Sequence, residues 1–277
     1  MTFTLSVSAA LGCMLCNGAA AVLQKVSADQ QKPTHGLKFG LLWRLMQDVP
    51  YASGIILDAV GWGLTFVAVQ YLPLYFVESI VAASIGITAL LERFFLHKAL
   101  SRKAYMAIMI VFAGLVCLSV AASTGKAHAI SHTVSWALVL AVIPLAGLAA
   151  IATRLRHAWA SFSIAVLSGI AFGQTSVLSR TFRLDGPLWH ILLNPFTYGL
   201  AVFGILGVLL FSIALQRMRA TVTTATMTVS QTVVPTIIGL TLFGDEARNG
   251  LGWLLLVGLI ISLVGVVMLC MHSRVKM

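Results

Sequence analysis

The stretch YASGIILDAVGWGLTFVAVQYLPLYFVESIVAASIGITALLERFFL, from Tyr51 to Leu96, decides the fold. It is apolar almost throughout, and it is long enough for two helices of about 20 residues, the length that crosses a bilayer. The very short loop Tyr71–Pro73 predicts that the two helices form a tight hairpin. Two carboxylic acids, Asp58 and Glu78, lie inside it. Placing a carboxylate in hydrocarbon is costly, so these two acids point to a function.

The composition of the whole chain agrees with this stretch. Of 277 residues, 59% are hydrophobic and only 9% are charged, and the mean hydropathy is +0.98. We therefore expect an all-α polytopic membrane protein with no room for a separate catalytic domain. The sequence shows no phosphate-binding glycine loop, no Ser/His/Asp set and no paired catalytic acids. We expect neither an enzyme nor a bound cofactor.

The hydropathy pattern predicts nine membrane spans, with short connections between them. They are Phe3–Val22, Tyr51–Leu72, Pro73–Leu96, Ala104–Ala122, Val134–Thr153, Ser161–Leu178, Phe196–Leu215, Ala220–Phe243 and Gly250–Met271.

The basic residues predict the orientation of these spans. With nine spans, 14 of the 18 Lys and Arg side chains fall on the side of the C-terminus and four on the side of the N-terminus. The positive-inside rule then places the N-terminus outside and the C-terminus in the cytoplasm, in the plasma (inner) membrane. We interpret the net charge of +10 as this topology signal, with membrane lipid and no nucleic acid as the partner.

Two parts of the chain resemble each other. Gly18–Lys25 at the end of the first span matches Gly173–Arg180 at the end of the sixth, and weaker matches follow in the same order. The chain thus divides into a first repeat of four spans (1–123), a linker span (124–158) and a second repeat of four spans (159–277). Five crossings separate each span from its counterpart, so the two repeats are inverted, as in secondary transporters.

A short element follows the first span of each repeat. Gly36–Val49 has its leucines mainly on one face, and Pro187–Leu193 is a shorter analogue. These elements could be amphipathic helices in the membrane interface or loops that rest on the lipid headgroups, and we favour loops.

Asp58 and Glu78 are the main candidates for binding a substrate or coupling ion. They lie on antiparallel neighbouring spans and are staggered in depth by roughly 10 Å. Such an acid can take up a proton on one side and release it on the other, or exchange it for a cation. The alternative for Asp58 is a structural contact with Asn17, Thr65 or a backbone carbonyl. Glu78 lies shallow enough to reach headgroup water.

Other polar residues at membrane depth could join this site. They are Asn17, Gln174, Ser84, Ser230 and Gln231. Gly18, Gly173 and Pro235 are candidates for helix breaks or gating, because a proline frees a backbone carbonyl that often lines a cavity. The alternative is hydrogen bonding between helices. We interpret Gly169-x-x-x-Gly173 and the glycines at 54, 61 and 63 first as packing positions that allow close helix contact.

We expect structural roles for the other polar residues. Glu92 and Arg93 are expected to form a shielded ion pair at the membrane interface. Cys13 and Cys16 form a C-x-x-C pattern, which we interpret as packing because no second pair or histidine lies near it.

The pattern resembles the drug/metabolite transporter superfamily. The matching features are the short inverted halves, the acidic turn Thr241–Glu246 after a tight hairpin, the Gly-rich closing span, and Pro235 about three turns before the acids. Nine spans with an outside N-terminus are similar to its NIPA-like, magnesium-transporter-like branch rather than to ten-span EamA-like members. In that branch an acid on the second span and polar residues on the third resemble Asp58 and the stretch Glu78–Ser84. The first half departs from the pattern, with no proline matching Pro235 and His97-Lys98 in place of the acids.

These observations favour a secondary active transporter of a small polar or cationic solute. If a cation is carried, Asp58 and Glu78 would be its metal ligands, and Mg²⁺ would suit their oxygen atoms. The alternatives are a magnesium or other divalent-cation transporter and a non-transporting membrane scaffold or lipid-handling protein. The partners expected are therefore lipid and a small-molecule or cation substrate, and a homodimer stays open.

Overall fold

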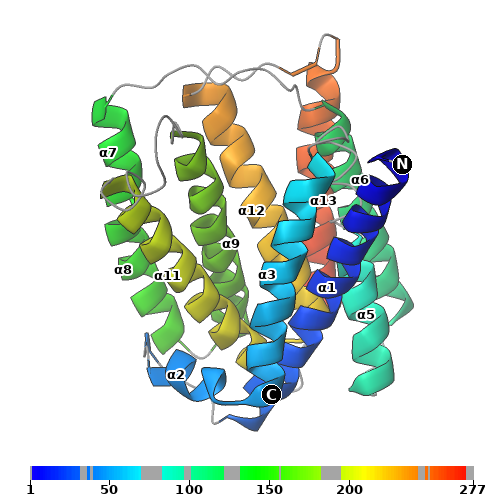
Figure 1. Cartoon of the computed structure of the whole chain (residues 1–277), viewed down its shortest axis with the longest axis vertical. Helices are drawn as coiled ribbons and strands as arrows, with labels where there is room; N and C mark the ends of the chain where they lie inside the picture. The colour runs from blue at the N-terminus through cyan, green and yellow to red at the C-terminus, as the bar shows by residue number, and fades with distance from the viewer. Residues whose placement is uncertain are drawn as a thin grey trace.

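The computed structural model describes residues 2–31, 36–37, 40–69, 83–96, 101–121, 132–155, 157–181, 195–242, 247–248 and 250–272. Within these ranges all the secondary-structure elements are α-helices, which confirms the predicted all-α class. The long helices lie side by side, and the chain begins near one end of the bundle and finishes near the other (Figure 1).

The helices have the following bounds. They are α1 (Thr2–Gln30), α2 (Gly40–Met46), α3 (Val49–Val69), α5 (Ser84–Phe95), α6 (Arg102–Ala121), α7 (His132–Leu140), α8 (Val142–Arg154), α9 (Ala158–Thr181), α11 (Pro195–Arg217), α12 (Ala220–Leu242) and α13 (Gly252–His272).

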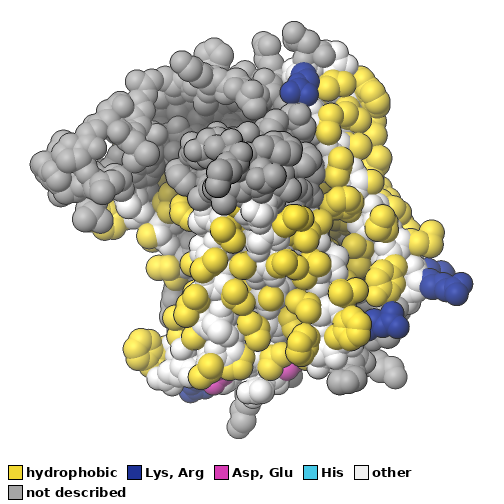
Figure 2. Space-filling model, turned by 45° about the vertical axis from the view of Figure 1, so that its right-hand side comes forward, with side chains coloured by type: hydrophobic (Ala, Val, Ile, Leu, Met, Phe, Trp, Pro, Cys, Tyr) yellow, Lys and Arg dark blue, Asp and Glu magenta, His cyan; other side chains and the backbone are white. Residues whose placement is uncertain are grey.

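The helices carry the apolar surface of a membrane protein. Five segments in the described ranges are long and apolar enough to cross a bilayer: Arg102–Ala121, Trp136–Arg154, Trp159–Leu178, Thr197–Arg217 and Gly252–Leu269. Figure 2 shows hydrophobic side chains over the described part of one face, with Lys and Arg at its margins. Side chains such as Trp62 and Leu256 point outward because lipid, not water, solvates them. The chain is thus a membrane-embedded helical protein, while the count of nine spans and the inverted repeat stay predictions.

The first span and the linker span differ from their predicted form. Helix α1 continues eight residues past the predicted end at Val22, to Gln30. The linker span is interrupted at Ala141, between α7 and α8. Pro144 explains the interruption, because it has no N–H to donate to the carbonyl of Leu140, four residues earlier.

Gly40–Met46 of the element Gly36–Val49 forms helix α2, so the favoured interpretation of this element as a loop is wrong there. Leu41 and Leu45 are buried, whereas Trp43 and Arg44 are exposed on the other side. Figure 1 shows α2 lying across one end of the bundle, beside the start of α3. The counterpart predicted at Pro187–Leu193 lies outside the described residues.

The helices pack in a repeated order. Helix α1 lies against α3 and α5, and α9 lies against α11 and α12. Helices α6 and α13, the last helices of the two predicted repeats, pack against each other. In chain order these are the same helices of the two predicted repeats.

The contact between α6 and α13 depends on glycine. A Cβ atom at Gly114 would lie 2.5 Å from the backbone nitrogen of Ser262. One at Gly258 would lie 2.9 Å from the Cβ of Cys117, and one at Gly265 would lie 2.7 Å from the backbone nitrogen of Val111. The two backbones therefore approach too closely for any larger residue at these three positions.

We expect Gly114→Ala to lower the free energy of unfolding by about 1–3 kcal/mol, because the methyl group forces two backbones apart. Gly204→Ala is the matched control, since a Cβ atom there meets nothing within 4 Å in the described structure. In the middle of a helix this control should be neutral or stabilise by up to about 1 kcal/mol. Thermal unfolding of both variants in detergent micelles tests the packing, and equal midpoints for the two would contradict it.

Candidate functional site

Asp58 lies where α3 crosses α1. Its Oδ2 accepts a hydrogen bond of 2.6 Å from Nε2 of Gln24, whose side chain is 1% exposed. Gly54, one turn before Asp58, allows this approach, because a Cβ atom there would lie 2.7 Å from Cγ of Gln24. The carboxyl group is thus held half-buried by an uncharged amide from the neighbouring helix.

Gln24 was not predicted as the partner of Asp58. The alternatives weighed from the sequence were Asn17, Thr65 and a backbone carbonyl, and Asn17 is wrong in the described structure. Its Nδ2 lies 3.4 Å from Sγ of Cys13, and its Oδ1 packs against Gly61 of α3. The side chain of Thr65 lies outside the described residues. Gln24 was overlooked because the first span was expected to end at Val22, two residues before it.

Ser84 lies at the contact between α5 and α1. It is 5% exposed, and its carbonyl accepts a hydrogen bond of 3.0 Å from Oγ1 of Thr88. The same hydroxyl lies 3.4 Å from the carbonyl of Gly18. A Cβ atom at Gly18 would lie 2.6 Å from Cγ2 of Ile87, so this glycine is a packing position. Glu78, the second predicted acid, lies outside the described residues.

The predicted residues of the second half meet where α9 crosses α12. A Cβ atom at Gly169 would lie 2.6 Å from Cβ of Ser230 and 3.1 Å from the nitrogen of Gln231. One at Gly173 would lie 3.0 Å from the ring of Pro235. The glycines therefore act as predicted for packing, as do Gly54 and Gly61. In contrast, Cβ at position 63 would meet nothing within 4 Å in the described part of the chain.

Two hydrogen-bond acceptors lie near this crossing. The side chain of Gln174 is 8% exposed, and in the described structure its Oε1 accepts no hydrogen bond. Pro235 leaves the carbonyl of Gln231 without its usual donor four residues later. The crossing of α9 and α12 thus offers hydrogen-bond acceptors, whereas the crossing of α1 and α3 offers the carboxyl group of Asp58.

The structure groups the predicted residues by half. The first group, Asn17, Gly18, Asp58 and Ser84, lies on α1, α3 and α5. The second group, Gly173, Gln174, Ser230, Gln231 and Pro235, lies on α9 and α12. Among the described residues no hydrogen bond joins one group to the other. That both groups line one midplane site stays a prediction.

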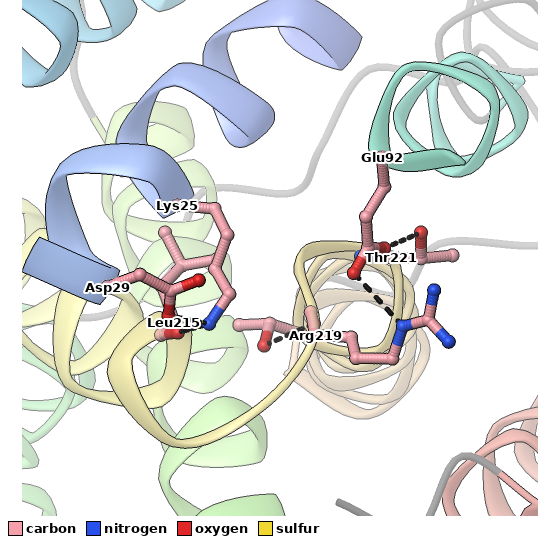
Figure 3. Close-up of polar contacts among 7 residues, drawn as sticks. Lys25, Asp29, Glu92, Leu215, Arg219 and Thr221 are labelled. Atoms are coloured by element: carbon pink, nitrogen blue, oxygen red, sulfur yellow. Dashed lines mark hydrogen bonds and ion pairs between the residues drawn. The ribbon is translucent and has the colours of Figure 1, made fainter. Parts of the chain in front are cut away.

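Glu92 of α5 forms a buried contact that was not predicted. Its carboxylate is 0% exposed and accepts from Nε of Arg219 at 3.0 Å and from the backbone N–H of Thr221 at 3.1 Å. The hydroxyl of Thr221 donates to the same carboxylate (Figure 3). The predicted pair with Arg93 is wrong, because adjacent residues of a helix do not face each other.

Lys25 of α1 is also buried, at 3% exposed. Its ammonium group binds the carboxylate of Asp29 and the backbone carbonyl of Leu215 in α11 (Figure 3). The hydroxyl groups of Tyr51 and Ser212 form a third buried contact, at 2.7 Å. These residues could have been noticed in the sequence because they are polar and lie next to long apolar runs. Their hydrogen-bond partners could not be predicted from the sequence.

A metal ion would need several of these donors together. Within the described ranges no three His, Cys, Asp or Glu side chains come close enough to hold one. The predicted pair Asp58 and Glu78 is not tested by this, since Glu78 is outside those ranges. The carboxylate oxygens of Asp58 suit a hard cation such as Mg²⁺. Water would supply the remaining ligands of that cation.

We expect Gln24→Leu to lower the free energy of unfolding by about 1–3 kcal/mol, because it leaves the carboxyl group of Asp58 without its donor. Adding Asp58→Leu should recover part of this loss, since no polar group then remains to be satisfied. Thermal unfolding midpoints of the single and double variants measure the effect.

Gln31→Leu is the control for this pair. Gln31 donates to Asp48, which also accepts from Oγ of Ser27 at 2.7 Å and so keeps a partner. Its effect should stay within about 0.5 kcal/mol. A double variant no more stable than Gln24→Leu alone would show that the amide does not support Asp58.

The chain was compared with known proteins by family, by sequence and by structure. No family model, no curated protein and no solved structure matches it.

Proposed function

We propose that this protein is a secondary active transporter that moves a small polar or cationic solute across the membrane by alternating access. The observation that carries the proposal is Asp58, a carboxyl group between two apolar helices whose hydrogen-bond partner is the uncharged amide of Gln24. An ionisable group at membrane depth serves function more often than packing, because its desolvation is costly.

The partner of Asp58 suits a group that changes its charge. An amide N–H can donate to a carboxylate and also to the carbonyl oxygen of a protonated carboxyl group. Gln24 therefore holds Asp58 in place in either form. A fixed Lys or Arg would instead neutralise the carboxylate permanently, and it would compete with a proton or a substrate cation.

The order of helix packing supports two inverted halves. Helix α1 contacts α3 and α5 as α9 contacts α11 and α12, and a glycine lies at the crossing in both halves. Gly18 and Gly173 are these glycines, and they are the matched positions of the sequence repeat. Two similar halves of opposite orientation supply two equivalent conformations that open to opposite sides.

The remaining parts of the proposal come from the sequence. We place the protein in the plasma membrane with its N-terminus outside, on the basis of the 14 to four distribution of Lys and Arg. Membership of the drug/metabolite transporter superfamily belongs to the same proposal. Its supporting features are the nine predicted spans, Asp58 on the second of them, and Pro235 before the acidic turn.

The nature of the site restricts the solute. A single carboxylate with nearby amides favours a cation, an amine or a polar metabolite carried with protons, and it disfavours a free anion. Mg²⁺ and a primary amine are therefore the first solutes to test, and a nucleotide sugar, which is an anion, is the contrasting case. A thermal-shift screen of these three at two pH values selects the one for flux measurements.

We expect Asp58→Asn to abolish coupled flux of the selected solute into proteoliposomes, by on the order of a hundredfold, while the protein stays folded. The amide keeps the shape of the carboxyl group but cannot take up a proton or balance a cation. Asp48→Asn is the control, because Asp48 lies at the start of α3 and bonds only Ser27 and Gln31 among the described side chains. Equal flux in the wild type and Asp58→Asn would remove Asp58 from the mechanism.

A further inference from the structure

Three helices of the first half contact one short segment of the second half. The segment is Ser212–Thr221, which comprises the end of α11, the turn and the start of α12; we call it the hairpin segment. Tyr51 of α3 bonds Ser212, Lys25 of α1 bonds the carbonyl of Leu215, and Glu92 of α5 bonds Arg219 and Thr221. We call these the three inter-half contacts.

Apart from Arg219, whose side chain is 20% exposed, the side chains of these contacts are almost completely shielded from solvent. Tyr51, Glu92, Ser212 and Thr221 are each 0% exposed, and Lys25 is 3% exposed. The charges of Lys25 and Glu92 are therefore satisfied by atoms of the hairpin segment and, for Lys25, by Asp29. If the two halves separate here, both charges lose partners, and only water could replace them. The two charged groups are therefore stable when the contacts are fully formed or when water hydrates them fully. A partly open arrangement, with neither protein partners nor water, is unfavourable.

An apolar cluster lies beside these contacts. Ala21 and Ala28 of α1 pack against Phe211 and Leu215 of α11 and against Ala220 of α12. All five side chains are buried, Ala28, Leu215 and Ala220 completely. The alanines of α1 allow the larger side chains of α11 to pack closely, and this close packing leaves no room for water at this end of the bundle. Polar contacts and apolar packing thus close the same junction between the halves.

The inter-half contacts are connected to Asp58 along two helices. Lys25 directly follows Gln24, the residue whose amide binds Asp58. Tyr51 precedes Asp58 by seven residues, which is two helical turns, so both side chains lie on the same face of α3. A shift of α1 against α3 when Asp58 gains or loses a proton or cation would displace Lys25 and Tyr51 together.

We propose that the three inter-half contacts and the apolar cluster form the gate that closes one side of the solute pathway, at the end of the bundle where α11 and α12 join. The contacts break together when the pathway opens to that side, and water then hydrates Lys25 and Glu92. This inference rests on the proposed transport function and identifies how access to its site is controlled. By the predicted orientation, this is the cytoplasmic gate.

Thiol labelling tests the gate without any solute. In the full-length chain, the four native cysteines (Cys13, Cys16, Cys117 and Cys270) are replaced by alanine, and Ala28→Cys provides one reporter inside the apolar cluster. The rate of its reaction with a small maleimide is measured in nanodiscs. In the closed state the buried thiol reacts slowly, so the rate reports how often the gate opens.

Removing a single inter-half contact should accelerate labelling. We expect about a tenfold increase for Glu92→Gln and for Lys25→Met, because a charged hydrogen bond biases a two-state equilibrium by about that factor. Tyr51→Phe, which deletes only a hydroxyl group, should give about a threefold increase.

Two controls share the location but not the contact. Asp48→Asn changes an acid at the same end of the bundle whose partners, Ser27 and Gln31, belong to the first half. Lys103→Met removes an exposed cation at the start of α6. Both should label at the rate of the parent. If Glu92→Gln or Lys25→Met does not fold, as judged by its unfolding midpoint, Tyr51→Phe and Ser212→Ala decide the question.

The outcomes separate the gate from the transport function. Variants that label no faster than Asp48→Asn would overturn the gate, even if Asp58→Asn abolishes flux. Faster labelling of the inter-half variants alone supports the gate, and it does so even if Asp58→Asn leaves flux unchanged, a result that would remove Asp58 from coupling.

Discussion

A carboxylate that no water reaches must receive its hydrogen bonds from the protein, and Glu92 receives all of those described here from the other half of the chain. The guanidinium of Arg219 supplies the opposite charge, and the first turn of α12 supplies an N–H and a hydroxyl group. A helix start has unpaired N–H groups and a partial positive charge, so it suits an anion. The interaction therefore fixes where α12 begins, and with it the register of α12 against α5 and α9.

The same requirement explains the other polar contacts of the bundle. Lipid offers no hydrogen bonds, so each buried polar group must find a partner within the bundle or sit beside a place that water or a solute can enter. Lys25, Tyr51 and Asp58 have such partners. The acceptor oxygen of Gln174 has no partner in the described structure. The crossing of α1 and α3 thus holds an ionisable group, whereas the crossing of α9 and α12 holds an uncharged acceptor.

Local patterns in the sequence predicted the helices, their apolar surfaces and the glycines at the crossings, because each depends on neighbouring residues. Asp58 could be identified as a candidate because a charge in an apolar run is visible locally. The hydrogen-bond partners of these buried groups could not be identified from local patterns. Glu92 pairs with Arg219 across 127 positions of the chain, and nothing near either residue specifies that distance. Spacing suggested Arg93 instead, which points to another side of α5. Gln24 was missed for a different reason, since the helix that carries it proved longer than its apolar part.

The glycine contact between α6 and α13 has a consequence for how the protein is made. Helix α6 ends at Ala121, and α13 begins only at Gly252, so the ribosome must add all the residues between them first. At cellular rates of synthesis this takes on the order of ten seconds. During that time the glycine face of α6 lies in the membrane without its final neighbour, where other small-residue helices or an insertion factor can cover it. The glycine contact of the bundle therefore forms only when α13 arrives, and a chain that stops before Gly252 leaves α6 without this partner.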